Sequence, residues 1–247
     1  MPITLPTTPI PAKTVSPTVL TLYGAPKIGK TSIVTALDNY LLLELEPGGA
    51  DFLDACKLQV DNLLLFNGIA DEIKRQRDKT NTDPYKFIIV DTVDELEAWC
   101  EKDARNDYMK TPQGKSFSGD SILELPQGGG YYWLRNSFYK WFHHIRRMAP
   151  FTIFIGHVRD KLLTNEGKEV SAKDLDLTGK VRNMLCSYSD AIGHMYRNVE
   201  GKLVISFETK ETVQCGSRAK HLAGKKFTFS QPATRDDWKQ IYPDVIV

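Results

Sequence analysis

The stretch at residues 24–31 constrains this chain more than any other part of its sequence. It reads GAPKIGKT and fits the pattern G-x-x-x-x-G-K-[ST]. An apolar, β-prone run at residues 19–23 precedes it, and residues 32–37 can begin a helix. A glycine-rich turn between strand and helix points successive backbone N–H groups at one anion, and the helix N-terminus adds its positive dipole end. The sequence therefore predicts a phosphate-binding loop.

Several residues of this loop have expected roles in binding a nucleotide and Mg²⁺. Lys30 would supply a mobile cation to the β- and γ-phosphates, and the hydroxyl of Thr31 would ligate Mg²⁺. Lys27 stands where many such loops carry glycine, and nucleotide binding tolerates it if the local backbone is not left-handed. The alternative is a glycine-rich turn with an exposed lysine. The predicted nucleotide-binding residues are Gly24, Ala25, Pro26, Lys27, Ile28, Gly29, Lys30, Thr31 and Ser32.

A carboxylate is expected at the end of the next strand. The run at residues 40–45 begins with continuous apolar residues and is typical of a buried parallel strand. Pro-Gly-Gly at residues 47–49 stops it and leaves Glu46 at the carboxyl end, where ligands bind in an open α/β sheet. Beyond this point, residues 51–58 predict a short helix and residues 62–66 a short strand.

A second carboxylate follows a run of four apolar residues. Residues 87–90 lead into Asp91, which is a Walker B pattern that would hold Mg²⁺ through water beside the phosphate loop. Thr92, not glutamate, comes next, so a base that activates water must lie elsewhere if ATP is hydrolysed. Our first choice for this base is Glu46, with Asp94 or Glu95 as the fallback.

A histidine and a charged loop follow the next predicted strand. Residues 151–157 predict a buried strand with His157 at its carboxyl end, either as a packed histidine or as a γ-phosphate sensor. Residues 158–175 contain a hairpin-type turn at 165–168 between charged arms. These arms form either a solvated hairpin or a loop that binds a nucleic-acid backbone. The candidate DNA-binding residues are Arg159, Lys161, Lys168 and Lys173.

The remaining segments complete an alternating pattern. Residues 111–127 predict a mobile surface loop. An aromatic-rich helix to about residue 148 follows, and its rings could stack on bases, although helical spacing favours core positions for Trp133, Phe138, Trp141 and Phe142. Strands at 189–196 and 202–208 would add antiparallel pairs, and residues 236–241 suggest a last helix. A basic cluster contains Arg218, Lys220, Lys225 and Lys226.

Composition limits the kinds of binding partner and the cellular compartment that we expect for this protein. The net charge is +1, so DNA binding would have to come from a local patch. The four cysteines include no C-x-x-C pair, which argues against a zinc site or a disulfide framework and fits a reducing cytoplasm. No run of 18 apolar residues and no signal peptide is found, so we expect a cytoplasmic protein with no membrane partner.

Proline and threonine enrichment sets the N-terminus apart from the rest. Residues 1–17 hold five prolines and cannot form a helix, so they predict either a disordered arm or an extended arm laid on a neighbouring subunit. Residues 18–247 show no internal repeat and no clear boundary. They predict a single domain with a short C-terminal extension.

Together these pieces resemble the RecA-type ATPases, and within them the phage-encoded AAA-domain proteins that include single-strand-annealing recombinases. LELE at 43–46 is similar to the RecA segment whose glutamate activates the attacking water, which places that role on Glu46. FIGHVRDK at 154–161 resembles the strand that ends in the RecA sensor, a position where the phage group commonly has histidine, here His157. GSRAK at 216–220 resembles the segment that offers a basic finger to a neighbour's γ-phosphate, here Arg218 or Lys220. The resemblance covers residues 18–225.

The resemblance implies an α/β, RecA-like P-loop NTPase fold. A mostly parallel central sheet would be flanked by helices, with antiparallel strands added at the C-terminal end. It further implies an ATPase that uses ATP and Mg²⁺, is slow as a monomer, assembles into a homo-oligomeric ring or filament, and acts on single-stranded DNA in the host cytoplasm of a phage. The alternatives are an ATP-binding adaptor or loader with little turnover, and a P-loop kinase. A GTPase is disfavoured because no N-K-x-D motif follows Asp91.

Overall fold

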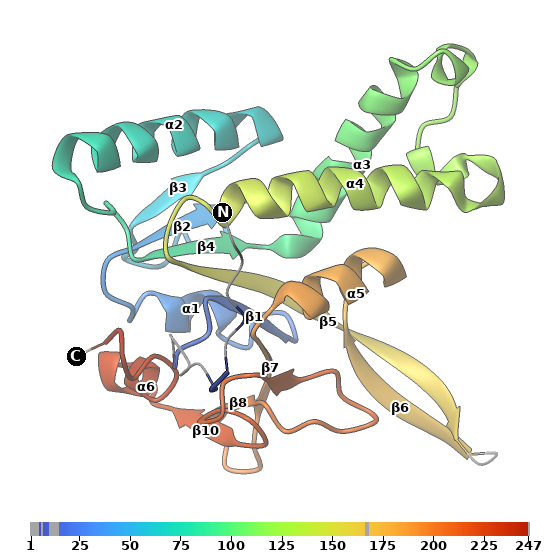
Figure 1. The fold of residues 1–247 in the computed structure, drawn as a ribbon. Coiled ribbons are helices and arrows are strands. Elements are labelled where there is room, and N and C mark those ends of the chain that lie inside the picture. Colours follow the sequence, from blue (N-terminus) through green and yellow to red (C-terminus); the bar gives the residue numbers. More distant parts are fainter. Residues whose placement is uncertain (1–4, 6, 10–14, 166–167, 247) are drawn as a thin grey trace.

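A computed structural model describes residues 5, 7–9, 15–165 and 168–246, and these residues form one central sheet with helices on both sides (Figure 1). The strands are β1 (Val19–Gly24), β2 (Tyr40–Glu44), β3 (Lys57–Gln59), β4 (Phe87–Asp91), β5 (Phe151–Asn165), β6 (Lys168–Leu175), β7 (Ala191–Arg197), β8 (Leu203–Ser206), β9 (Gly216–Ser217) and β10 (Lys226–Phe229). The helices are α1 (Lys30–Val34), α2 (Leu63–Thr80), α3 (Val93–Met109), α4 (Gly129–Ile145), α5 (Gly179–Tyr188) and α6 (Arg235–Lys239).

The strand order explains how distant segments meet. Across the sheet it is β10-β8-β7-β1-β5-β4-β2-β3. All pairs from β7 to β3 are parallel, whereas β8 and β10 add antiparallel pairs at one side. β5 lies between β1 and β4, so the ends of these three strands share one edge. The predicted fold class is confirmed, including the antiparallel strands late in the chain.

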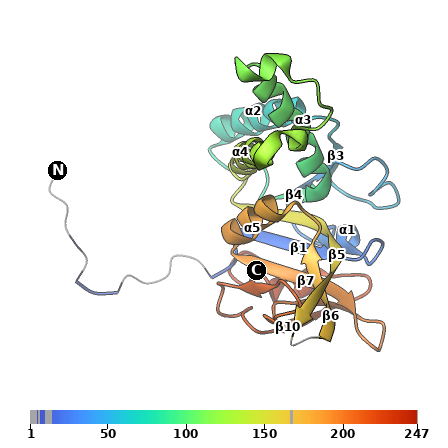
Figure 2. The ribbon, with the colours of Figure 1, turned by 90° about the vertical axis from the view of Figure 1, so that its right-hand side faces the viewer.

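The two faces of the sheet bury two separate apolar clusters. Alternate residues of one strand point to opposite faces, so Leu41 and Leu43 pack under α2, α3, α4 and α5, whereas Leu42 packs toward α1 and α6. The predicted aromatic core is confirmed in α4, where Phe138, Trp141 and Phe142 are buried, while Trp133 packs against the cluster from a partly exposed position. Figure 2 shows the layer of α2, α3 and α4 on one side of the sheet.

The segment between β2 and α2 differs from expectation. Residues 51–58 do not form a helix: residues 51–53 turn, residues 54–56 have no regular structure, and β3 begins at Lys57. Residues 62–66 do not form a strand, because Asn62 caps α2 by accepting a hydrogen bond from the backbone N–H of Leu65 over 3.1 Å. The apolar run that suggested a strand is the first turn of an amphipathic helix, which buries Leu63 and Phe66.

Residues 111–127 are more ordered than a plain surface loop. They contain three 3₁₀ helices, η1 (Gln113–Ser116), η2 (Ile122–Glu124) and η3 (Pro126–Gly128). Ile122 is fully buried in the larger apolar cluster, and Ser121 begins η2 with a capping box. The segment therefore joins α3 to α4 as a packed cap on the outer end of the helix pair.

The two ends of the described domain lie together. Backbone N–H of Val15 donates to the carboxylate of Asp244 over 3.3 Å, and the hydroxyl of Ser16 also donates to it. Trp238 of α6 is fully buried and donates from its indole nitrogen to the carbonyl of Ile33 over 2.7 Å. Most of the predicted arm over residues 1–17 lies outside the described residues. Among the helices that the structure describes, none has the length and hydropathy needed to cross a membrane.

Candidate functional site

The predicted phosphate loop joins β1 to α1 at the carboxyl edge of the sheet. Gly29 has φ 110° and directly precedes α1, which is a conformation that favours glycine. A Cβ on Gly24 would lie 2.6 Å from the carbonyl oxygen of Met195 in β7, so the loop begins where two backbones meet closely. Lys27 has φ 60°, so the condition set for it from sequence fails: its backbone is left-handed. A side chain at this conformation costs about 1–2 kcal/mol, yet the loop still joins β1 to α1 with lysine in place, so Lys27 lowers stability without removing the predicted phosphate loop.

Lys30 is buried and directed back at the loop. Its Nζ donates to the carbonyl oxygens of Gly24 over 3.1 Å and Ala25 over 3.0 Å. An ammonium has three donors, so these two bonds leave one. Burial lowers the pKa of Lys30, and the nearby carboxylates of Asp91, Asp94 and Glu46 oppose that effect.

Thr31 and Asp91 meet at the same edge. The Thr31 hydroxyl donates to Oδ2 of Asp91 over 2.6 Å. Burial raises the pKa of Asp91 and Glu46 adds to the effect, whereas Thr31, Lys30 and His157 oppose it. A hydroxyl and a carboxylate are oxygen ligands of the kind that Mg²⁺ uses together with substrate phosphates, so this pair fits the ion.

Glu46 lies two residues beyond the end of β2 and faces the residue after Asp91. The Thr92 hydroxyl donates to Oε1 of Glu46 over 2.6 Å. Thr92 also caps α3 by accepting from the backbone N–H of Glu95 at 3.5 Å. Sequence reasoning assigned no role to Thr92, although the T-x-x-E pattern of a capping box was present.

His157 lies in the same cavity but not at the end of its strand. β5 continues through it to Asn165, and His157 is instead the last position of the parallel ladder, opposite Gly24. Its Nδ1 lies 3.1 Å from Oδ2 of Asp94, which also accepts from its backbone N–H. The hydrogen bond with Asp94 raises the pKa of His157 against opposition from burial.

A cavity of about 520 Å³ brings these side chains together. Its lining includes Lys30, Thr31, Glu46, Asp91, Thr92 and His157. Phe52 also lines it and is 98% exposed, and no motif in the sequence indicated this position. Backbone N–H of Ala50 donates to buried Glu44 over 2.5 Å, which ties the segment after Glu46 to β2. The site can hold a phosphate chain, a divalent ion and a water between two carboxylates and a lysine.

Arg218 lies away from this cavity. Its backbone N–H donates to the carbonyl of Asp190 over 2.8 Å, and the backbone N–H of Asp190 donates to Val19 at the start of β1. The guanidinium of Arg218 is 3.5 Å from Asp190 and largely exposed. Because the phosphate loop follows the other end of β1, Arg218 lies at the opposite edge of the sheet and cannot reach the site of its own chain.

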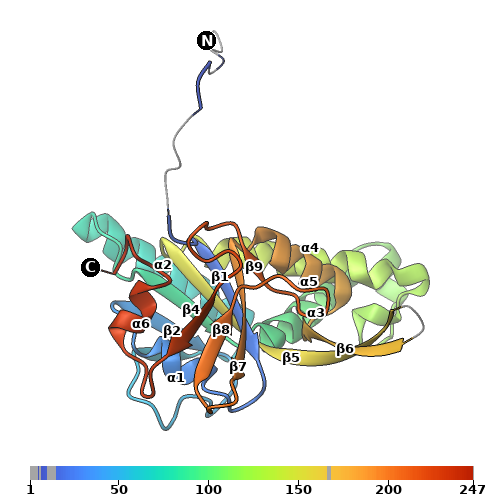
Figure 3. The same ribbon diagram turned by 90° about the horizontal axis from the view of Figure 1, so that it is seen from below.

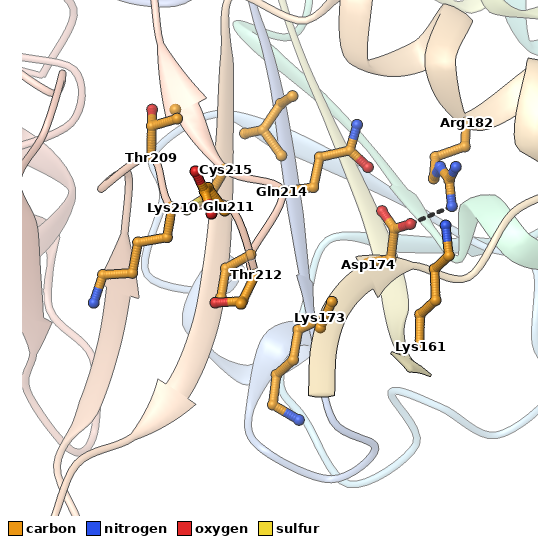
Figure 4. Close-up of a pocket in the computed structure, with 14 residues that line it drawn as sticks. Lys161, Lys173, Asp174, Arg182, Thr209, Lys210, Glu211, Thr212, Gln214 and Cys215 are labelled. Carbon is orange, nitrogen blue, oxygen red and sulfur yellow. Dashed lines mark hydrogen bonds and ion pairs between the residues drawn. The ribbon is translucent and has the colours of Figure 1, made fainter. Parts of the chain in front are cut away.

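The predicted charged hairpin is present as β5 and β6, which pair from Val158–Leu175 to Asn165–Lys168. Its turn at 166–167 lies outside the described residues, as does the side chain of Lys168. Arg159 is 3.7 Å from Asp176, and Lys173 is 2.7 Å from Asp160. Figure 4 shows Lys161 and Lys173 beside a pocket of about 450 Å³, close to the ion pair of Arg182 with Asp174. The structure thus gathers the described cations at the hairpin base but pairs two of them with acids.

Comparisons with known proteins give one family match. Residues 16–219 match the family described as AAA domain. None of the curated proteins matches the chain. Among solved structures, the crystal structure of the RadB recombinase is 13% identical with a TM-score of 0.44, over 87% of this chain and 88% of that one. That likeness is too low to support an inference, so the function proposed below rests on the family match and on the site.

Proposed function

Because this chain belongs to the AAA domain family, we propose that it binds ATP with Mg²⁺ and hydrolyses it. One observation carries the proposal. Four segments that are far apart in the sequence place Lys30, Thr31, Asp91, Glu46 and His157 around one cavity at one edge of the sheet. A phosphate loop alone would support binding, whereas a carboxylate positioned beside it also supports hydrolysis.

The phosphate loop would hold the triphosphate. The ammonium of Lys30 and the backbone N–H groups of residues 27–31 would stabilise negative charge that develops on the transferred phosphoryl group. Thr31 and Asp91 would hold Mg²⁺, which neutralises charge on the phosphate oxygens when bound. Asp91 holds the ion in its ionised form: burial raises the pKa of Asp91, and the hydrogen bond from Thr31 and the charge of Lys30 oppose that effect.

Glu46 is the proposed water-orienting base. Its carboxylate retains a second oxygen for water after Oε1 accepts from Thr92. Thr92 thereby fixes the carboxylate relative to Asp91, the residue beside it in the chain. His157, oriented by Asp94, would donate from its Nε2 to the γ-phosphate while the ring is protonated.

We further propose that the working form is an oligomer. The position of Arg218 at the edge opposite the phosphate loop supports action on a neighbouring subunit, with Lys220 as the alternative. A basic finger supplied by a partner contributes about 10³–10⁵ in rate, so an isolated chain should turn over slowly. The resemblance to phage single-strand-annealing recombinases supports single-stranded DNA of a phage as the substrate on which the ATPase acts.

The proposal is tested by the ATPase rate as a function of protein concentration, with and without single-stranded DNA. We expect the specific rate to rise with concentration and to require Mg²⁺, so that EDTA abolishes it. Glu46→Gln should abolish turnover while ATP binding remains, and Glu95→Gln serves as a matched control at the fallback position. A wild type without turnover at high concentration with DNA would contradict hydrolysis and leave the adaptor function.

A further inference from the structure

A second cavity lies far from the phosphate loop, between α4 and α5. These helices contact each other, and Figure 1 shows α5 beneath α4. The cavity has a volume of about 540 Å³. Its lining side chains include Arg135, Asn136 and Tyr139 from α4 and Lys180, Asn183 and Tyr188 from α5. We call it the α4–α5 groove.

Two tyrosines are exposed in the groove, although neighbouring rings on α4 are buried. Tyr139 is 45% exposed and Tyr188 is 36% exposed, with ring centroids 5.9 Å apart and planes at 59°. His143 packs behind both, at 4.2 Å from Tyr139 and 5.2 Å from Tyr188. The rings are therefore held from one side and open to solvent on the other. Base stacking requires aromatic rings that are accessible to the ligand, and these two are partly exposed and supported by His143.

The charge of the groove has one sign. Arg135 and Lys180 contribute one cation from each wall, and none of the described residues that line the groove is acidic. In contrast, the described cations at the hairpin are neutralised in part, since Arg159 faces Asp176 and Lys173 faces Asp160. An anionic ligand therefore meets less competition from protein carboxylates in the groove than at the hairpin.

We propose that the α4–α5 groove binds single-stranded nucleic acid, with bases stacked on Tyr139 and Tyr188 and phosphates beside Arg135 and Lys180. The choice of nucleic acid as the ligand rests on the proposed function. The inference places the DNA-binding residues in this groove instead of on the hairpin. A single strand fits because only unpaired bases offer their faces to side chains. The two asparagines can donate to and accept from base edges.

The test measures binding of a fluorescein-labelled oligo(dT) of about 20 nucleotides to the full chain by fluorescence anisotropy. The double variant Tyr139→Ala/Tyr188→Ala should raise Kd by about 30-fold or more, the low end for loss of two stacked bases. Tyr139→Phe/Tyr188→Phe keeps both rings and should leave Kd near that of the wild type. Melting temperature of each variant separates lost binding from lost folding.

A second pair of variants tests the cations. Arg135→Gln/Lys180→Gln should lower the slope of log K against log salt by about 0.7 for each phosphate contact removed. The matched control is Lys74→Gln/Lys79→Gln, which removes two exposed lysines from α2 and should leave the slope unchanged. ATP hydrolysis is measured on every variant without DNA, so failure of this inference is separable from failure of the ATPase proposal.

Several outcomes would overturn the inference. The inference fails if the wild type does not bind oligo(dT), or if the groove variants bind it with the wild-type Kd. It also fails if the α2 control variant lowers the salt slope as much as the groove variant does. Equal affinity for duplex and single strand would exclude stacking. A change of oligomeric state in the groove variants, measured by light scattering without DNA, would assign the groove to a subunit contact instead.

Discussion

The hydroxyl of Thr92 lies 2.6 Å from Oε1 of Glu46 and donates to it, so the residue after Asp91 orients the carboxylate after β2. Thr92→Val removes this donor. We expect kcat to fall by about 10-fold or more, because a hydrogen bond to a charged group contributes about 1.5–3 kcal/mol, while the Kd for ATP stays constant. Thr92→Ser keeps the hydroxyl and should retain activity. Both are measured by steady-state ATPase kinetics and nucleotide titration, and equal kcat in the two would contradict the positioning role.

The pair of His157 and Asp94 predicts a pH dependence of stability. The hydrogen bond with Asp94 raises the pKa of His157 in the folded chain above its unfolded value. A raised pKa stabilises the fold below the unfolded pKa, and that contribution is lost as pH rises through the folded pKa. The excess stability of wild type over His157→Gln should therefore be larger at about pH 5.5 than at about pH 8.5 in urea unfolding.

His143 supplies a control of opposite sign. Burial lowers the pKa of its ring, and Arg146 and Arg147 add to the effect. The stability that depends on neutral His143 is present above its unfolded pKa and is lost as pH falls through the folded pKa. The excess of wild type over His143→Gln should thus be larger at the higher pH. The same sign for both variants would contradict the assignment to these side chains.

Substitution by alanine should change the unfolding free energy in opposite directions at Gly24 and at Gly68. Gly24→Ala places a Cβ 2.6 Å from the Met195 carbonyl, and β1 and β7 are paired there, so neither backbone can yield freely. We expect a loss of about 1–3 kcal/mol in unfolding free energy. Gly68 is exposed in α2 with open space around it, and Gly68→Ala should gain about 1 kcal/mol. Urea unfolding of both variants measures the difference, and equal effects would contradict a close approach at Gly24.

The exposed Arg218 predicts complementation between subunits. Arg218→Ala and Glu46→Gln chains should each be nearly inactive alone. When the two variants are mixed in equal amounts, about a quarter of neighbouring pairs join a chain with intact Glu46 to a neighbour with intact Arg218. Turnover of the mixture should therefore recover to about a quarter of the wild-type rate. Lys220→Ala in the same mixture tells which cation acts. No recovery from either mixture would contradict action on a neighbour.

The regular parts of this fold could be predicted from sequence. Long apolar runs predicted β1, β2 and β4, and the turn at 165–168 between charged arms predicted the hairpin, because run length and turn residues are local properties of a chain. The segment at 51–66 could not be placed, since β3 has three residues and an apolar run at a helix start resembles a strand. The true extent of β5 was also hidden, because a strand keeps its pattern when its partners change from parallel to antiparallel.

The identities of several site residues could be predicted from sequence, but the contacts between them could not. Lys30, Thr31 and Asp91 follow from motifs whose spacing reflects one mechanism. The hydrogen-bond partners of Glu46 and His157 depend on the order of strands in the sheet. Because β4 lies between β2 and β5, Thr92 and Asp94, which follow β4, reach Glu46 and His157 respectively. The lysine itself does not indicate the left-handed backbone at Lys27, and only its place where many such loops carry glycine pointed to that conformation.

The unbroken course of β5 has a mechanical consequence. The strand pairs with β1 and β4 in the sheet and then with β6 outside it, and Figure 3 shows the hairpin leaving the sheet as its extension. From His157 to Asn165 it spans about 26 Å. A flexible loop would have to order in response to a change at His157, whereas a strand paired along its length would pass the change on as a tilt. A tilt of about 5° at the cavity would displace the far end by about 2 Å, so a small movement at His157 would become a larger one at the tip of the hairpin.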